Sequence, residues 1–236
     1  MSDKVSIDFE VYPIKIVEKH IIALINNKNV LIDTGSPCSV GAFNQLTLMN
    51  KTFRLYKNYL GLEVDKLSKF IGSRIDVLLG GDILSKFFFC INWNTEKIQF
   101  SSSPIVSDVL EIPLNFYMDI PIIELKISNR DIKTFLDTGA KLSYLDPDIT
   151  SNYKIKEEKT DFYHLIGEFN TPVYKIPVIF ANRRFIFNFG NLPELLQTAL
   201  RISNVEGILG NEIFLHYSIC FDYRRKKLIL KEIISK

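Results

Sequence analysis

The chain of 236 residues is 47% hydrophobic and 24% charged, a composition typical of a globular protein with one large or two small domains. Its formal net charge of +2 is too small to indicate a nucleic-acid or membrane-surface partner. Charged residues are scattered through residues 1–27, which excludes a signal-peptide core and a membrane-spanning helix in that segment. The three cysteines, an odd number, argue against a disulfide framework, so we expect a cytoplasmic protein; export without a cleavable signal is the open alternative.

The first predicted element is a β-hairpin. Apolar runs at residues 21–25 and 30–32 flank a polar turn at residues 26–29. The second run leads directly into the segment Asp-Thr-Gly-Ser at residues 33–36. A short helix is predicted over residues 65–71, because an apolar periodic pattern there ends at a glycine. It precedes a Leu-Leu-Gly segment.

The second half of the chain repeats this order of elements. Apolar runs at residues 122–127 and 132–136 flank another polar turn and predict a second hairpin. The segment Asp-Thr-Gly-Ala follows at residues 137–140. A second helix is predicted to start at Pro193, in its first turn, and it precedes an Ile-Leu-Gly segment.

The spacing of these segments indicates an internal duplication. The two Asp-Thr-Gly motifs are 104 residues apart, whereas the later glycine-bearing segments and the Cys90 and Cys220 segments are 130 apart. Matching segments in one order predict two similar lobes, residues 1–105 and 106–236, joined near a serine-rich stretch. The second lobe therefore holds 26 more residues than the first, and alternating apolar residues around 162–189 predict an added hairpin.

Asp33 and Asp137 are the candidate catalytic residues. Each follows an apolar strand and precedes a tight turn, so two symmetric lobes are expected to bring the carboxyl groups together. Two carboxylates within about 3 Å cannot both ionise, and they share one proton, a general pattern of paired catalytic aspartates. The ionised carboxylate can take a proton from water while the protonated one donates to a carbonyl oxygen. This chemistry needs neither a metal ion nor a cofactor.

The residues after each aspartate have predicted supporting roles. Gly35 and Gly139 are expected to let the backbone turn sharply and bring its N–H groups close to the carboxylates. The hydroxyl groups of Thr34 and Thr138 are expected to cross between the lobes and bond the backbone of the opposite copy. They would fix the geometry of the pair.

The fourth position of the motif differs between the copies. Ser36 is expected to donate a hydrogen bond from its hydroxyl group to ionised Asp33, whereas Ala140 has no such donor. We therefore expect the pair to be less acidic than one with two hydroxyl donors.

The paired motifs, each followed by two apolar residues and a glycine at Gly80 and Gly210, resemble those of pepsin-like and retropepsin-like aspartic proteases. The resemblance spans residues 21–230. It implies an all-β, bilobal fold built from a duplicated retropepsin-like unit with a few short helices, and an aspartic endopeptidase that hydrolyses polypeptides. Because one chain supplies both lobes, we expect a monomer without nucleic-acid or membrane partners.

The family resemblance also implies a flap, which is a hairpin that covers the substrate. Residues 42–62 of the first lobe offer Tyr56 and Tyr59 without a clear hairpin pattern. The alternative is the second lobe, where Tyr163, Gly167 and Phe169 lie in the added segment. The same segment is also compatible with a hairpin of the core.

The histidines and cysteines do not indicate a different chemistry. The histidines lie far apart in the sequence, so we expect no zinc site. Cys90 and Cys220 occupy equivalent positions, and buried thiols are favoured over a disulfide. Cys38 has no histidine placed to activate it as a nucleophile. The alternative function is a catalytically weak or inactive peptide-binding or regulatory protein of the same fold.

Overall fold

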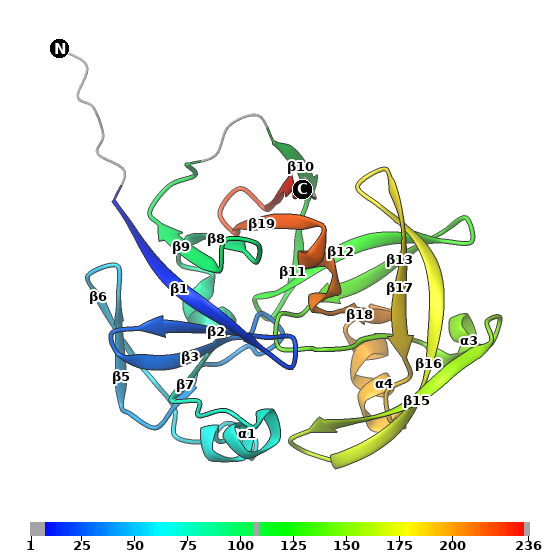
Figure 1. Cartoon of the computed structure of the whole chain (residues 1–236), viewed down its shortest axis with the longest axis horizontal. Coiled ribbons are helices and arrows are strands. Elements are labelled where there is room, and N and C mark those ends of the chain that lie inside the picture. The colour runs from blue at the N-terminus through cyan, green and yellow to red at the C-terminus, as the bar shows by residue number, and fades with distance from the viewer. Residues whose placement is uncertain (1–7, 106–108, 234–236) are drawn as a thin grey trace.

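The computed structural model describes residues 8–105 and 109–233, and β-strands form most of it, as the sequence predicts (Figure 1). The first lobe contains the elements β1 (Phe9–Val17), β2 (His20–Ile25), β3 (Lys28–Ile32), β4 (Val40–Gly41), β5 (Gln45–Leu48), β6 (Lys51–Arg54), α1 (Val64–Ile71), β7 (Val77–Leu79), α2 (Gly81–Leu84), β8 (Phe88–Asn92) and β9 (Lys97–Ser101).

The second lobe repeats this plan with longer strands. Its elements are β10 (Leu110–Pro113), β11 (Asn115–Tyr117), β12 (Ile120–Ile127), β13 (Arg130–Leu136), β14 (Ser143–Leu145), α3 (Pro147–Thr150), β15 (Ile155–Tyr163), β16 (Gly167–Phe180), β17 (Arg183–Gly190), α4 (Glu194–Ile202), β18 (Gly207–Leu209), the 3-10 helix η1 (Asn211–Leu215), β19 (Tyr217–Asp222) and β20 (Lys227–Glu232). The expected lobe boundary falls beside residues 106–108, which lie outside the described part of the chain.

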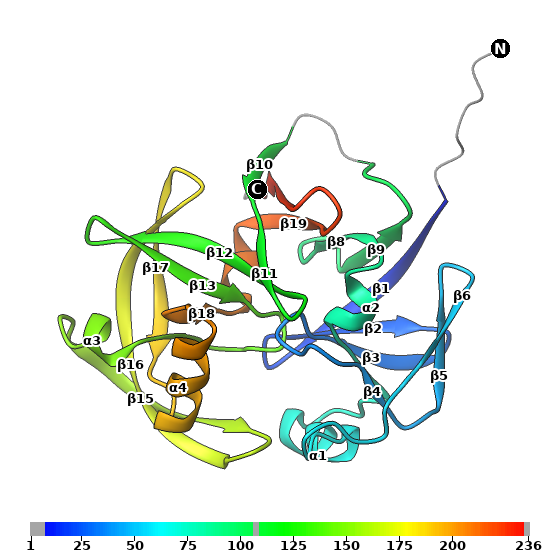
Figure 2. The same cartoon turned by 180° about the vertical axis from the view of Figure 1, so that it is seen from behind.

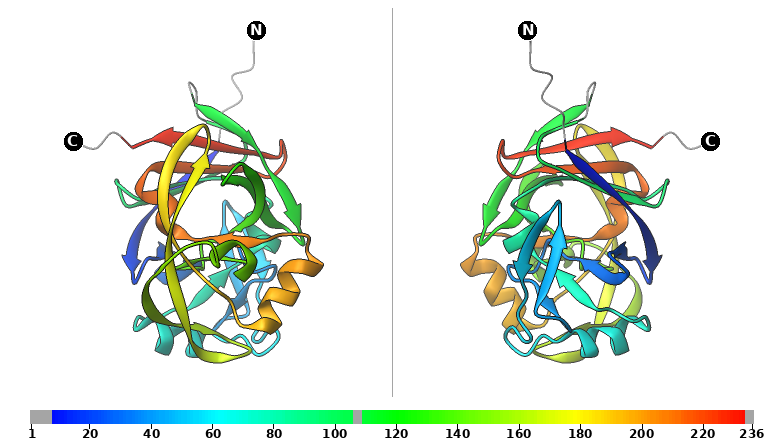
Figure 3. Two further views of the ribbon diagram at one scale, coloured as in Figure 1. Left: turned by 90° about the vertical axis from the view of Figure 1, so that its right-hand side faces the viewer. Right: turned by 90° about the vertical axis from the view of Figure 1, so that its left-hand side faces the viewer.

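One sheet joins the two lobes. It runs in the order β10-β20-β19-β8-β9-β1, so three strands of the second lobe continue into strands of the first through the pairing of β19 with β8. β1 then continues into the first lobe, because its early residues pair with β9 and its later residues pair with β2. Figures 1 and 3 show this shared sheet at one end of the molecule, opposite the end occupied by α1 and the tip of the β15–β16 hairpin.

Both predicted hairpins and both predicted helices are present. The β2–β3 and β12–β13 hairpins have two-residue turns at residues 26–27 and 128–129 instead of the four-residue turns expected. All four turn residues have positive φ, the backbone of tight hairpin turns that match the twist of the strands. The helix α1 ends at Gly72 in a left-handed conformation, and α4 begins directly after Pro193; Figure 2 shows the two helices on different lobes.

The extra residues of the second lobe form long strands. β16 pairs with β15 on one side and with β17 on the other, so the predicted added hairpin is confirmed as part of a three-stranded extension. Its inward residues, including Val173, Ile176 and Phe187, are fully buried in the core of this lobe. The segment therefore serves both as core and as a projecting hairpin.

The expectation of free thiols at Cys90 and Cys220 is wrong. The two residues lie opposite each other on the antiparallel strands β8 and β19, and their sulfur atoms form a disulfide. The sequence placed them at equivalent positions, but only the pairing of the two lobes across one sheet makes them neighbours. The cysteine-based argument for a reducing compartment is thereby removed.

Among the helices of residues 8–105 and 109–233, none is long and apolar enough to cross a membrane. Within the same residues, no cluster of three or more histidine, cysteine, aspartate or glutamate side chains is arranged to hold a metal ion.

Candidate active site

Two equivalent strand ends place the candidate catalytic residues. Asp33 follows β3, which runs parallel to β7, and its N–H donates to the carbonyl oxygen of Leu79 at 3.0 Å. Asp137 follows β13, which runs parallel to β18, and its N–H donates to the carbonyl oxygen of Leu209 at the same distance. The duplicated Leu-Gly segments therefore support the two aspartates in the same way.

Thr34 and Thr138 tie the two aspartate loops together. The Thr34 hydroxyl donates to the carbonyl oxygen of Leu136 and accepts from the N–H of Thr138, at 2.7 and 3.0 Å. Thr138 makes the reciprocal pair, donating to Ile32 and accepting from the N–H of Thr34 at the same distances. Both threonines are fully buried, so these are the crossing bonds that the sequence led us to expect.

Backbone N–H groups, and not the Ser36 hydroxyl, surround the carboxylates. The N–H groups of Gly35 and Ser36 both donate to Oδ1 of Asp33 at 3.0 Å, and the N–H of Gly139 donates to Oδ1 of Asp137 at 2.7 Å. The Ser36 hydroxyl instead donates to the carbonyl oxygen of Cys38. The predicted serine donor is therefore wrong, because a hydroxyl group has one proton and this one bonds the backbone of its own loop.

The same correction applies to the expected effect of Ala140. Its backbone N–H lies beside the Asp137 carboxyl group, where it lowers the pKa of that group, as the Ser36 N–H does for Asp33. Ser36 and Ala140 therefore supply the same backbone donor. The structure gives no reason to expect that Ala140 makes the pair of aspartates (the dyad) less acidic.

Gly35 and Gly139 are needed because each lies against the carboxyl group of the opposite lobe. A Cβ atom on Gly35 would stand 2.2 Å from Cγ of Asp137, and one on Gly139 would stand 2.6 Å from Cγ of Asp33. The chain turns at both glycines and their N–H groups reach the carboxylates, as expected, but neither glycine has positive φ, so what excludes a larger residue is lack of space. These contacts place the two carboxyl groups side by side across the lobe interface.

The surroundings of the two carboxyl groups raise the pKa of both. Burial, the Asp137 charge and a hydrogen bond with Asp137 raise the pKa of Asp33 well above its usual range. Burial also raises the pKa of Asp137, whereas hydrogen bonds from Gly139 and Asp33 work in the opposite direction. The two carboxyl groups therefore titrate as one pair that shares a proton. Both residues remain partly exposed, so water can reach them.

The two lobes carry very different hairpins after their aspartates. β5 and β6 do form a hairpin in the first lobe, but Leu46, Leu48 and Met49 are buried in the core of that lobe. Figure 1 shows this hairpin on the side of the first lobe away from the second lobe. The β15–β16 hairpin of the second lobe instead extends to α1 of the first lobe.

Three predicted flap residues lie on this second-lobe hairpin. Gly167 has positive φ where the chain turns into β16, and Phe169 contacts the ring of Tyr144 with centroids 6.3 Å apart. Burial and the charges of Asp137 and Asp33 raise the pKa of Tyr163 to about 12. The phenol of Tyr163 is therefore near enough to both aspartates for their charges to affect its pKa.

The first-lobe candidates are placed differently from each other. Tyr56 is 54% exposed and bridges to Val40 through its backbone. Tyr59 is partly buried and lies beside Cys38. The Cys38 thiol raises the pKa of the Tyr59 phenol, and a hydrogen bond with Tyr59 works to lower the pKa of Cys38. Burial raises the pKa of Cys38, which agrees with the expectation that it is not an activated nucleophile.

Several residues that support the site were missed in the sequence. The amide of Asn211 donates to the carbonyl oxygens of Lys19 in the first lobe and Thr138 in the second, at 2.8 and 2.7 Å. Its counterpart under the spacing of 130 is Gly81, so this departure from the duplication was a usable signal. The hydroxyl groups of Ser39 and Ser143, which are 104 residues apart, accept from the N–H groups of the two later glycines.

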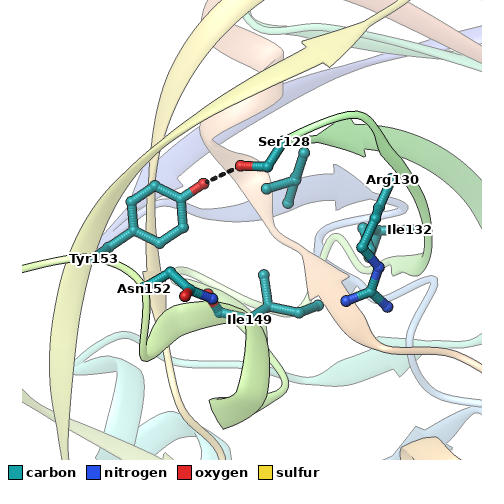
Figure 4. A pocket seen from close by; sticks show the side chains of 7 residues that line it. Ser128, Arg130, Ile132, Ile149, Asn152 and Tyr153 are labelled. Carbon is teal, nitrogen blue, oxygen red and sulfur yellow. Dashed lines mark hydrogen bonds between the residues drawn. The ribbon is translucent and has the colours of Figure 1, made fainter.

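A separate surface pocket of about 340 Å³ lies in the second lobe (Figure 4). The turn between β12 and β13 and the segment around α3 form it, and Ser128 bonds Tyr153 at one side. None of the candidate catalytic or flap residues lines this pocket.

Comparisons with family models and with curated protein sequences found no match. Among solved structures, the chain is similar to "Crystal structure of a retropepsin-like aspartic protease from Rickettsia conorii". The two chains are 18% identical with a TM-score of 0.38, and the alignment covers 52% of this chain and 91% of the other.

Proposed function

We propose that this protein is an aspartic endopeptidase whose active site is the Asp33–Asp137 pair. The observation that carries the proposal is the reciprocal bonding of Thr34 and Thr138, which brings one carboxyl group from each lobe to a single, partly exposed position. Paired carboxyl groups with raised pKa values are suited to acid–base chemistry on a bound water molecule.

Because the two carboxyl groups share one proton, one is ionised and the other protonated when the reaction starts. The ionised carboxylate takes a proton from water as the water oxygen bonds to the carbonyl carbon of the peptide, and the protonated group gives its proton to the carbonyl oxygen, which produces a neutral tetrahedral diol. The C–N bond then breaks as the newly protonated carboxyl group gives its proton to the leaving nitrogen and the other carboxylate takes a proton from the diol, so the acid and amine products separate and the shared proton is restored.

The proposed substrate is an extended polypeptide held under the β15–β16 hairpin. The hairpin tip presents the apolar side chains of Leu165 and Ile166, which are 51% and 37% exposed, next to Tyr163. We therefore expect a preference for apolar side chains near the cleaved bond. Since both aspartates belong to one chain, a monomer is sufficient for the activity.

The proposal is tested by cleavage of a diverse pool of unfolded peptides between pH 3 and pH 8. We expect the Asp33→Asn and Asp137→Asn variants to lose at least about 100-fold in kcat/KM, because each removes one of the two proton-transfer groups. The exposed Asp65 on α1 provides a matched control, and Asp65→Asn is expected to cleave like the wild type. Equal cleavage by wild type and both dyad variants, or none by folded wild type, would reject the proposal.

A second function is favoured by one observation. The first-lobe hairpin is packed into its own core, so within residues 8–105 and 109–233 we assign the covering role to the β15–β16 hairpin alone. A protein that binds peptides with weak or no hydrolysis is consistent with this asymmetry. Peptide binding that survives Asp137→Asn, with no cleavage by the wild type, would select this alternative.

A further inference from the structure

The side chain of Phe70 connects helix α1 of the first lobe to the hairpin of the second. Its ring stacks on the ring of Phe162 in β15, with centroids 4.7 Å apart and an angle of 27° between the planes. The ammonium group of Lys141 lies over the same ring, 4.6 Å from the centroid. Both distances are within the range of favourable aromatic and cation–π contacts.

Lys141 is itself held in place by the hairpin. Its Nζ atom lies 3.4 Å from Oδ1 of Asp161, the residue that precedes Phe162. Asp161 also accepts hydrogen bonds from the hydroxyl of Tyr144 and from the N–H of Phe162. These two bonds fix the position of the Asp161 carboxylate, so it holds the Lys141 ammonium group at one place.

These contacts are sheltered from solvent. The Asp161 side chain is 10% exposed and the Lys141 side chain is 25% exposed. Salt and water screen charges at such positions less than they screen a surface ion pair. The Lys141–Asp161 pair is therefore expected to stabilise the folded protein more than an exposed pair does.

The position of Lys141 links this cluster to the dyad. It comes directly after the Asp-Thr-Gly-Ala segment of the second lobe, whose Gly139 lies against Asp33. One set of contacts therefore joins the catalytic loop, the covering hairpin and the helix of the opposite lobe. The first-lobe hairpin, buried in its own core, has no part in it.

We propose that Phe70 is a positioning residue whose contacts with Phe162 and Lys141 latch the β15–β16 hairpin across the lobe interface over Asp33 and Asp137. This inference rests on the proposed function for its role in hydrolysis, but the latch itself is a property of the hairpin. A peptide enters when the contacts of Phe70 with Phe162 and Lys141 break, and the hairpin covers the bound peptide when these contacts form again. The ring of Phe70 and the charge of Lys141 are both required.

The latch is tested first without any substrate, by amide hydrogen exchange of residues 155–170. Phe70→Leu keeps an apolar side chain but removes the ring, and Lys141→Met keeps the length but removes the charge. We expect each to raise the exchange rates of the hairpin amides about 2- to 10-fold. Phe70→Tyr and Lys141→Arg, which retain the ring and the charge, should exchange like the wild type.

Matched controls come from the same lobe and the same helix. Phe53→Leu removes a half-buried ring that contacts Phe87 of its own lobe, and Lys69→Met removes an exposed charge next to Phe70. Neither should change exchange in the hairpin. Unchanged exchange in Phe70→Leu and Lys141→Met, or an increase spread evenly over the second lobe, would overturn the proposal.

Peptide hydrolysis separates this inference from the proposed function. If the wild type cleaves peptides, kcat/KM should fall about 2- to 10-fold in Phe70→Leu and Lys141→Met and be restored in Phe70→Tyr and Lys141→Arg. A faster-exchanging hairpin with full activity would overturn the positioning role. If the wild type does not cleave, the exchange result still supports the latch, and only the proposed activity is rejected.

Discussion

At the scale of single residues, His20 is a buried imidazole at the lobe interface. It is the first residue of β2, its side chain is 5% exposed, and neither ring nitrogen has a hydrogen-bond partner within the described part of the chain. Burial and the charge of Lys141 lower its pKa to about 4, with the charges of Asp161 and Glu18 opposing that shift. The folded protein therefore keeps His20 neutral under mildly acidic conditions.

The low pKa makes the stability of the protein depend on pH. Between pH 6.5 and pH 4 the unfolded chain takes up a proton at His20 and the folded protein does not, so stability falls as pH falls. The interval from 6.5 to about 4 corresponds to a loss of about 3 kcal/mol, complete below pH 4. We expect His20→Leu to remove this loss, measured as the free energy of unfolding in urea at pH 7 and pH 4.

The control for this measurement is His216, an exposed histidine of the second lobe. His216→Gln should leave most of the acid-dependent loss in place. If His20→Leu and the wild type lose the same stability between the two pH values, another group is responsible for it.

At the scale of elements, the two lobes use equivalent segments in different ways. The β5–β6 hairpin is short and turns two leucines and a methionine into the core of the first lobe. The β15–β16 hairpin pairs eight residues, from Ile155 opposite Tyr174 to Tyr163 opposite Gly167, and its tip extends beyond the core. The added residues of the second lobe therefore form the hairpin to which we assign the covering role in the proposed function.

This difference predicts which tyrosine matters for hydrolysis. If the proposed function holds, Tyr163→Ala should lower kcat/KM about 10-fold or more, because it removes a side chain near both aspartates, where the proposed substrate would bind. Tyr56→Ala should change kcat/KM less than about twofold, since Tyr56 is 54% exposed on the other lobe. A larger loss in Tyr56→Ala than in Tyr163→Ala would place the covering segment in the first lobe.

The elements also show what the sequence can and cannot predict. The aspartate pair, its threonines, both helices and the added hairpin follow from local patterns and from the repeated spacing, which report backbone preference and symmetry. The direction of the β5–β6 hairpin, the bond made by the Ser36 hydroxyl and the contact of Phe70 with Phe162 do not. The hairpin direction and the Phe70–Phe162 contact depend on residues far away in sequence. The Ser36 hydroxyl bonds Cys38, two residues away, but the sequence does not specify which of several nearby acceptors a hydroxyl group reaches.

At the scale of the whole molecule, three features hold the lobes together in addition to the Asn211 bond to Lys19 and the Phe70–Phe162 contact. The shared sheet pairs β8 with β19, the threonine bonds join the aspartate loops, and the Cys90–Cys220 disulfide links the two central strands. The disulfide closes a loop of 130 residues, which spans the whole connection from one lobe to the other. Loss of pairing in this sheet would separate the lobes and therefore the two carboxyl groups.

The disulfide should accordingly stabilise the assembled form. A crosslink that closes a long loop restricts the unfolded chain, so the Cys90→Ser/Cys220→Ser variant is expected to be less stable than the oxidised wild type by about 2 to 5 kcal/mol. The free energy of unfolding in urea checks this, and the wild type measured in reductant should lose the same amount. Cys38→Ser is the matched control, because Cys38 is a free cysteine and its loss breaks no crosslink.

If the double variant and the oxidised wild type unfold at the same urea concentration, the shared sheet and the threonine bonds hold the lobes together without the disulfide. If the loss is found, hydrolysis should become more sensitive to urea in reductant, since both aspartates act only while the lobes remain joined.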